Sequence, residues 1–413
     1  MVAWLDAALE AGRLYRSVGA LDEEQLRPHV LRAWARSHAG GADPSRPRAE
    51  GLSSLDTERL RERHRGLLRA AEPYMRALSR ASGDERHAVM LGDARAIILD
   101  VRGDKQSVHG PERVPGPGAL LEESACGANG VGTALAEGGY VELVGPEHFI
   151  QGFHAFTCQG IPFRDGEGEV AGVLSVSVRR PEVGRGFREI LLCAAHAIEM
   201  ELLAERLEQD MERVLAARDV PTEELNRLLQ DILQVQAAAR LRIEIAADQL
   251  ARNLLTHTRD LIQLAATVLC RFRRRAALWR ALALDETVAP RPVALDATVR
   301  DIAELLEVES AVRDVTMTIQ EIEPVVVEAA PHTLARALFR ILLDAIKAAR
   351  GGVVHLALRS RPTGGELCLT LAPGLGVTMK APLPVRILVP ARQGAPERRA
   401  HGPAGHDPAE EMA

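Results

Sequence analysis

The stretch from Glu123 to Arg179 reads ESACGANGVGTALAEGGYVELVGPEHFIQGFHAFTCQGIPFRDGEGEVAGVLSVSVR, and it decides the fold of this part of the chain. Closely spaced glycines before residue 133 predict a tight turn into a short helix at 133–137, whose N-terminal amides could face a polar ligand group. Three segments have the character of short strands: 140–144, 156–162 and 170–178. The RDGEG run between the last two predicts a hairpin turn, so the whole stretch predicts a small α/β domain.

Four phrases within this stretch resemble, in the same order, the GAF sensor domain of acetoin-catabolism-type activators of sigma-54-dependent transcription. They are GANGVGTAL at 127–135, EHF at 147–149, FTC at 156–158 and DGEGEVAGVL at 165–174. The resemblance implies a GAF-like domain at about 84–180 that binds a small-molecule effector. The residues expected at its ligand site are Asn129, Thr133, His148, Phe149, Phe153, Phe156 and Cys158.

Several of these residues have a second interpretation. Asn129 and Thr133 are typical helix-capping residues and could serve the local backbone instead of a ligand. His148, His154 and Cys158 carry donor atoms that suit zinc or iron, but their spacing matches no compact metal motif, so we expect no metal. Cys158 could be a redox-sensing thiol, or a small buried hydrophobic residue within a strand.

The composition of the 413 residues is that of an ordinary multidomain protein, with 26% charged and 46% hydrophobic residues. A net charge of -6 and an aromatic content of 3% give no support to nucleic acid binding. No apolar run reaches the ~18–20 residues that a membrane span needs, and the amphipathic N-terminus does not resemble a signal peptide. Five cysteines without a CxxC pair indicate a reducing compartment, so we expect a cytoplasmic protein without membrane contact.

Helical patterns stand on both sides of the expected sensor domain. Residues 1–83 predict a helical lead-in, and residues 187–286, with no glycine and a single proline, predict long helices. Leu191, Ile198 and Leu207 follow the three-and-four spacing of a signalling helix or dimer seam. Two antiparallel helices from each of two chains would form a four-helix bundle, so we expect a homodimer; a plain helical linker is the alternative.

After residue 290 the pattern changes to a mixture of strands and helices. The expected strands are 315–319, 324–328, 353–358, 367–371 and 385–389, and the expected helices are 297–309 and 332–349. The tail at 393–413 is polar and rich in proline and glycine, which predicts disorder.

This succession resembles the dimerisation and ATP-binding domains of bacterial sensor histidine kinases over about residues 222–392. The phrases PVAL at 292–295 and LARALFRILLDAIKA at 334–348 carry the resemblance, which implies a degenerate GHKL-type domain at 290–392. Arg340 and Asp344 stand where the family has its two asparagines, and only Asp344 could ligate Mg²⁺. Thr370 replaces the adenine-accepting aspartate, and the glycine-rich lid is missing, so we expect no ATP, Mg²⁺ or other cofactor.

His257 is the candidate phosphoacceptor of the bundle, but the acidic residue and the proline that follow this histidine in the family are absent. The sequence therefore predicts an α+β multidomain sensor with N-terminal helices, a GAF-like domain, a helical bundle at 187–286 and a degenerate ATPase-like domain. Its expected partners are a small-molecule effector, a second copy, and a response regulator or transcriptional regulator. A pseudokinase that relays a metabolite or redox signal is the favoured function. The alternatives are an active, divergent kinase using His257, and a co-factor of a transcription regulator.

Overall fold

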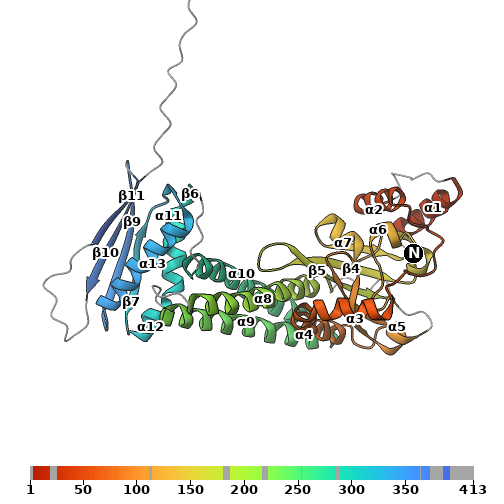
Figure 1. The fold of residues 1–413 in the computed structure, drawn as a ribbon, viewed down its shortest axis with the longest axis horizontal. Helices are drawn as coiled ribbons and strands as arrows, with labels where there is room; N and C mark the ends of the chain where they lie inside the picture. Colours follow the sequence, from red (N-terminus) through yellow and green to blue (C-terminus); the bar gives the residue numbers. More distant parts are fainter. Residues whose placement is uncertain are drawn as a thin grey trace, which may run out of the picture. The chain divides into compact units, whose positions relative to one another are not determined.

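The structure is a computed structural model that describes residues 3–18, 26–110, 114–179, 187–215, 222–252, 254–283, 289–362, 364–372 and 385–390. The chain divides into two compact units, residues 1–283 and 284–413, and each is described by itself (Figure 1). The tail at 393–413, for which the sequence predicts disorder, lies outside the described residues.

Four helices open the chain: α1 (Ala3–Val18), α2 (Pro28–Ala39), α3 (Ser54–Arg63) and α4 (Arg65–Ala81). α3 begins after Ser53, whose hydroxyl accepts the backbone N–H of Asp56 and so caps the helix. Trp34 on α2 is buried, its ring packs edge-on against Phe149, and its indole N–H donates to the carbonyl of Glu147 at 2.8 Å. Helices α1 and α2 therefore share one hydrophobic core with the domain at 84–179, which is called the sensor domain below after the resemblance of its sequence.

The sensor domain is built on a five-stranded antiparallel sheet in the order β2-β1-β5-β4-β3. Its strands are β1 (His87–Asp93), β2 (Ile98–Gly103), β3 (Val141–Val144), β4 (Thr157–Arg164) and β5 (Val170–Val178), and short helices α5 (Lys105–His109), α6 (Glu123–Cys126) and α7 (Gly132–Glu137) accompany them. The helix and the three strands predicted within 123–179 are confirmed, with ends within two residues of those predicted.

Neighbouring residues of β5 point to opposite faces of this sheet, as the pleat requires. Gly172 lies against Leu67 of α4, whereas Ser175 lies against Gly130 in the loop before α7. The sheet is thus covered by α4 on one face and by the glycine-rich loop on the other. A substituent on Gly130 would come within 2.8 Å of the Cβ of Cys158, so this close approach requires glycine.

Three long helices complete the first unit: α8 (Phe187–Leu215), α9 (Thr222–Ala251) and α10 (Leu255–Ala283). α8 packs against α4, α9 and α10, so a four-helix arrangement forms within a single chain (Figure 1). The sequence assigns Leu191, Ile198 and Leu207 to a dimer seam, but all three are fully buried within the first unit. This corrects the predicted seam, because heptad spacing shows that a helix face is covered but not by which chain. The homodimer stays a prediction.

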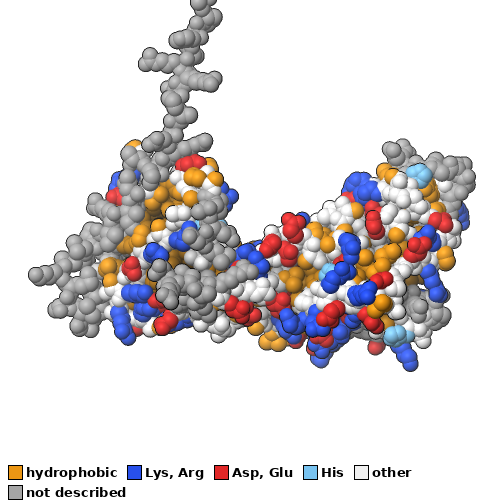
Figure 2. Space-filling model, in the orientation of Figure 1, with side chains coloured by type: hydrophobic (Ala, Val, Ile, Leu, Met, Phe, Trp, Pro, Cys, Tyr) orange, Lys and Arg blue, Asp and Glu red, His pale blue; other side chains and the backbone are white. Residues whose placement is uncertain are grey.

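The surface of this unit carries both signs of charge. Figure 2 shows acidic and basic side chains interspersed over the visible face of residues 1–283. None of the described helices is long and apolar enough to cross a bilayer.

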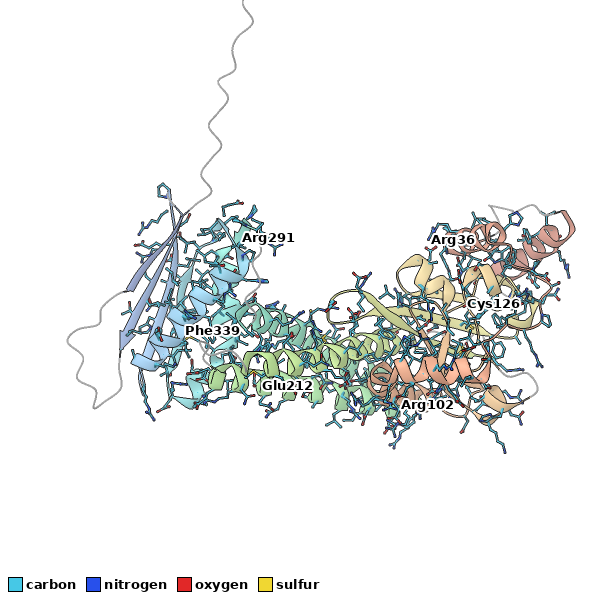
Figure 3. All side chains as sticks on the ribbon, viewed as in Figure 1. Arg36, Arg102, Cys126, Glu212, Arg291 and Phe339 are labelled. Atoms are coloured by element: carbon cyan, nitrogen blue, oxygen red, sulfur yellow. The ribbon has the colours of Figure 1, made fainter. Side chains whose placement is uncertain are left out.

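The second unit contains a four-stranded sheet, β11-β10-β9-β7, and a two-stranded sheet, β6-β8. Its elements are β6 (Arg291–Ala294), α11 (Leu295–Leu305), α12 (Glu307–Val312), β7 (Thr316–Ile322), β8 (Val326–Ala329), α13 (Pro331–Ala348), β9 (Val353–Arg361), β10 (Gly364–Ala372) and β11 (Val385–Pro390). β7 runs parallel to β9, and the other pairs are antiparallel. α13 buries one face, which includes Leu342 and Phe339 (labelled in Figure 3). The single helix predicted at 297–309 is wrong, since α11 and α12 are separate helices.

Candidate functional site

A cavity of about 770 Å³ lies beside the sheet of the sensor domain. Four strands each contribute one wall residue: Met90, Val101, Cys158 and Ser177. The remaining wall comes mainly from loops at 47–51, 114–121, 129–131 and 152–156. Concave sites of roughly 300–1,000 Å³ with mostly apolar walls are typical binding sites for small molecules. This cavity is therefore the candidate site of the sensor domain.

Cys158 and Ser177 pair across β4 and β5 and form a polar spot on the cavity wall. The Sγ–Oγ distance is 3.0 Å, and both side chains are buried. Burial raises the pKa of the Cys158 thiol to about 12, so the thiol stays protonated at neutral pH. The pair thus offers an uncharged hydroxyl and thiol that can exchange hydrogen bonds with a ligand oxygen. A protonated, buried thiol is a poor nucleophile, which argues against the redox-sensing interpretation of Cys158.

The charged side chains of the cavity wall are exposed to solvent, fully or in part. Arg48, Glu50 and His109 are exposed, and Arg179 is half-buried. The Arg179 guanidinium lies 5.1 Å from the centroid of the Phe156 ring, a cation–π contact at the edge of the cavity. Because a buried charge without a partner is costly, the interior suits an uncharged molecule better than an ion.

Asn129 borders the cavity, but its amide serves the backbone. Its Nδ2 donates to the carbonyls of Leu121 and Gly127 at 2.7 and 2.8 Å. Its Oδ1 accepts the N–H groups of Val131 and Gly132, both at 2.9 Å. The predicted presentation of the α7 amides to a ligand is therefore wrong, since Asn129 occupies them. Its side chain thus holds the turn that leads into α7.

Thr133 is not a wall residue and lies behind Asn129. Its hydroxyl accepts the backbone N–H of Asn129 at 3.1 Å and donates to the Glu123 carboxylate at 2.7 Å. Glu123 is buried and receives two hydrogen bonds from Arg36 of α2, at 2.6 and 3.0 Å. Arg36 (Figure 3) also reaches Glu137 at 2.8 Å. The lead-in helix is thus tied to the loop that borders the cavity.

Of the residues predicted to bind a ligand, Phe153 and Phe156 lie on the cavity wall, whereas Phe149 and His148 are not among the wall residues. Phe149 packs in the core, with its ring centroid 5.4 Å from those of Trp34 and of Tyr15 on α1. The Phe149 ring, which the sequence predicts to contact a ligand, is therefore covered by side chains of α1 and α2. His148, which belongs to the same EHF phrase, packs edge-on against the wall residue Phe153, with the ring centroids 5.9 Å apart.

His148 is fully buried in the loop after β3. Its Nδ1 donates to the carbonyl of Gly145 at 2.9 Å, and its Nε2 has no hydrogen-bond partner among the described residues. Burial lowers the pKa of His148 to about 4, so the ring is neutral. His154 turns its Nε2 to the carbonyl of His148 at 3.1 Å. Among the described residues, no group of three His, Cys, Asp or Glu side chains is placed to hold a metal ion.

The two candidates for kinase chemistry belong to different units. His257 is exposed in the first turn of α10, the second helix of the α9–α10 hairpin. Asp344 is exposed on α13. The first helix of the hairpin, α9, contains no histidine.

Several wall residues could not be found from the motifs. Met90 and Val101 belong to strands whose pattern showed only burial, and the loops at 47–51 and 114–121 lie outside the four phrases. Ser177 offered one signal, since it is one of two hydroxyl residues within a largely apolar strand and lies directly opposite Cys158.

The first unit of this chain is similar in sequence to known proteins. Residues 6–193 match the family model described as MimR, N-terminal domain. The first part of this chain is thus similar to the sensor regions of transcriptional activators such as AcoR and MimR. Relatives include the acetoin dehydrogenase operon transcriptional activator AcoR of Bacillus subtilis, 26% identical over 208 residues, which cover 50% of this chain and 34% of AcoR.

The propane 2-monooxygenase operon transcriptional activator MimR of Mycolicibacterium goodii is 29% identical over 170 residues, which cover 40% of this chain and 28% of that protein. The chain thus spans about a third of the length of these curated relatives. Among solved structures, the E. coli DhaR(N)–DhaL complex aligns with a TM-score of 0.44 and 17% identity, covering 46% of this chain and 66% of that chain.

Proposed function

We propose that this protein is a cytoplasmic sensor whose cavity binds a small, uncharged effector and whose helical bundle passes the signal to a regulator of transcription. The observation that carries the proposal is the cavity itself, with its apolar wall and the neutral Cys158–Ser177 pair. A neutral donor and acceptor within an apolar wall suit a molecule with one or two alcohol or carbonyl oxygens.

The names of two relatives suggest which compounds to test first as effectors. These relatives are named as activators of an acetoin dehydrogenase operon and of a propane 2-monooxygenase operon. Acetoin and the short alcohols and ketones with which it shares chemistry are therefore the first compounds to test. Short carboxylic acids serve as the charged comparison, and we expect them to bind more weakly because they would lose hydration without gaining a buried cation.

A binding experiment on the full chain tests this proposal. Thermal shift and calorimetry with acetoin, 2-propanol and acetone should show binding by at least one compound. Ser177→Ala should weaken that binding by about fivefold, since one hydrogen bond contributes about 1 kcal/mol. Ser175→Ala is the matched control, because Ser175 lies on the same strand but donates to the Gln159 carbonyl and is not a wall residue. Equal losses in both variants, or no binding by any compound, would contradict the proposal.

For the output, we propose a pseudokinase body formed by the α9–α10 hairpin and the second unit. Arg340 and Asp344, in place of the two asparagines of a kinase, support the loss of nucleotide chemistry. Incubation with labelled ATP and Mg²⁺ should then leave the protein unlabelled. Incorporation that disappears in His257→Gln would instead support an active kinase, since His257 is exposed and accessible.

We also propose that the protein is a homodimer, held through the outer face of the α9–α10 hairpin rather than through α8. Leu241 and Ile245 on α9 and Leu264 on α10 are 58%, 40% and 54% exposed. Leu241 and Ile245 are one helical turn apart, so they lie on one face of α9. An exposed apolar face of this kind is typical of a protein–protein contact.

A further inference from the structure

The hairpin of β4 and β5 extends from the cavity to the long helices. At one end, Cys158 and Ser177 belong to the cavity wall. At the other end, the Asp165 carboxylate accepts the backbone N–H groups of Glu167 and Glu169 at 2.8 and 3.0 Å and so closes the turn. From residue 158 to residue 164 the strand covers about 20 Å, at roughly 3.3 Å per residue. Paired strands with a closed turn are a stiff connection between these two ends.

A buried carboxylate on α8 holds the turn end of the hairpin together with α10. Glu199 is 7% exposed. It accepts the backbone N–H of Arg164 and the guanidinium of Arg273 on α10, both at 2.8 Å. The N–H of Arg164 is available because the pairing of β4 with β5 is irregular between Phe163 and Arg164.

A second buried carboxylate repeats this arrangement further along α8. Asp210 is fully buried and accepts Nε of Arg280 on α10 at 3.1 Å. The same guanidinium donates through Nη1 to the carbonyl of Gly166, within the turn, at 3.1 Å. Arg206 on α8 adds an ion pair with Glu167 at 3.0 Å.

These contacts define a clamp, made of Glu199 and Asp210 on α8 and Arg273 and Arg280 on α10, around the turn of the hairpin. In each pair the carboxylate is buried and the arginine is partly exposed. Such pairs add little net stability, but a buried carboxylate left without its partner is costly. The clamp therefore fixes the position of the turn relative to α10 more than it stabilises the bundle.

We propose that the β4–β5 hairpin is the lever that couples the cavity to α10, with Arg273 and Arg280 as positioning residues at its far end. A change in the cavity at Cys158 or Ser177 shifts the two strands, and the clamp passes the shift to α10. The proposal rests on the proposed function of the cavity as the effector site. It goes beyond that function by assigning the route and the residues of the coupling.

Hydrogen exchange of the full chain, followed by mass spectrometry, tests the lever without any ligand. Ser177→Leu places a larger side chain on the cavity wall and serves as the probe. We expect it to change the exchange rates of amides at 270–283 by about fivefold or more, the size of a typical coupling between sites. In Arg273→Met/Arg280→Met, the same probe should change exchange in the sensor strands but not at 270–283.

Arg275→Met is the matched control, because Arg275 also lies on α10 and pairs with Asp231 of α9 at 2.6 Å. This variant also loses an ion pair of α10 but keeps every contact of the clamp, so the effect of Ser177→Leu on α10 should persist in it. If Ser177→Leu fails to fold, Cys158→Leu on the paired strand replaces it as the probe. The lever is overturned if the cavity probe leaves 270–283 unchanged, or if its effect there survives loss of both clamp arginines.

Failure of the lever can be told apart from failure of the proposed function. Calorimetry with acetoin, 2-propanol and acetone reads the cavity alone, and the exchange experiment reads the coupling alone. Coupling without binding of any compound contradicts the effector proposal only. Binding without coupling contradicts the lever only.

Discussion

Replacing Asn129 by alanine should open the loop that borders the cavity even when no ligand is present. The Asn129 side chain is 2% exposed and makes four hydrogen bonds, two to carbonyls and two from backbone N–H groups. Each bond contributes about 1 kcal/mol net, and partners left without water would each cost somewhat more. The expected loss is therefore about 4 kcal/mol, a large share of the roughly 5–15 kcal/mol that stabilises a domain.

Native-state hydrogen exchange measures this loss where it should occur. The free energy of opening of peptides covering 121–137 should fall by about 4 kcal/mol in Asn129→Ala. Asn226→Ala is the matched control, since Asn226 is exposed on α9 and its loss should change stability by less than about 0.5 kcal/mol. A loss below about 1 kcal/mol in Asn129→Ala would refute the structural role, because one hydrogen bond alone contributes that much. The residue would then be free to serve a ligand.

Three further outcomes follow from the described contacts. Arg36→Met removes the cation from a buried carboxylate and should lower the free energy of unfolding in urea by about 3 kcal/mol, whereas Arg59→Met, in an exposed pair, should cost under about 1 kcal/mol; similar losses would show that the Arg36 contacts are not specific. The pKa of His148 falls from 6.5 to about 4 on folding, so between these two pH values the unfolded chain is protonated at this histidine and the folded chain is not. The free energy of unfolding is therefore unaffected by His148 above pH 6.5 and declines towards pH 4, by up to about 3 kcal/mol. His148→Gln should remove this part of the decline in urea midpoints, and an unchanged profile would exclude His148 as its source. Leu241→Glu/Leu264→Glu should convert a dimer to a monomer in light scattering, and a dimer that survives would move the contact elsewhere.

The strands and turns of the sensor domain were predictable because their signals are local. The glycines before residue 133 and the RDGEG turn act over a few residues, and the strand at 170–178 shows its alternation directly. The candidate site was predictable only in part. Phe153, Phe156 and Cys158 lie on the cavity wall. Phe149 instead packs against α1 and α2, because the rings of Tyr15 and Trp34 cover it there.

The bundle illustrates a second limit. Periodicity on α8 correctly indicated a buried face, yet the elements packed against α8 are α4, α9, α10, β4 and β5 of the same chain. A repeat of apolar residues specifies that water must be excluded from one side of a helix, and it carries no information about the partner.

The sequence by itself determined the elements of the sensor domain, its similarity to regulators of the acetoin type, and the uncharged side chains of Cys158 and Ser177 on its last two strands. Only the tertiary structure decided which residues face the cavity, and that the Asn129 amide forms hydrogen bonds with the backbone. It also decided that two carboxylates of α8 hold the β4–β5 hairpin to α10. The physical reason is one of range. Backbone preferences act between neighbours in the chain, whereas a cavity wall and a buried ion pair depend on which distant segments exclude water together.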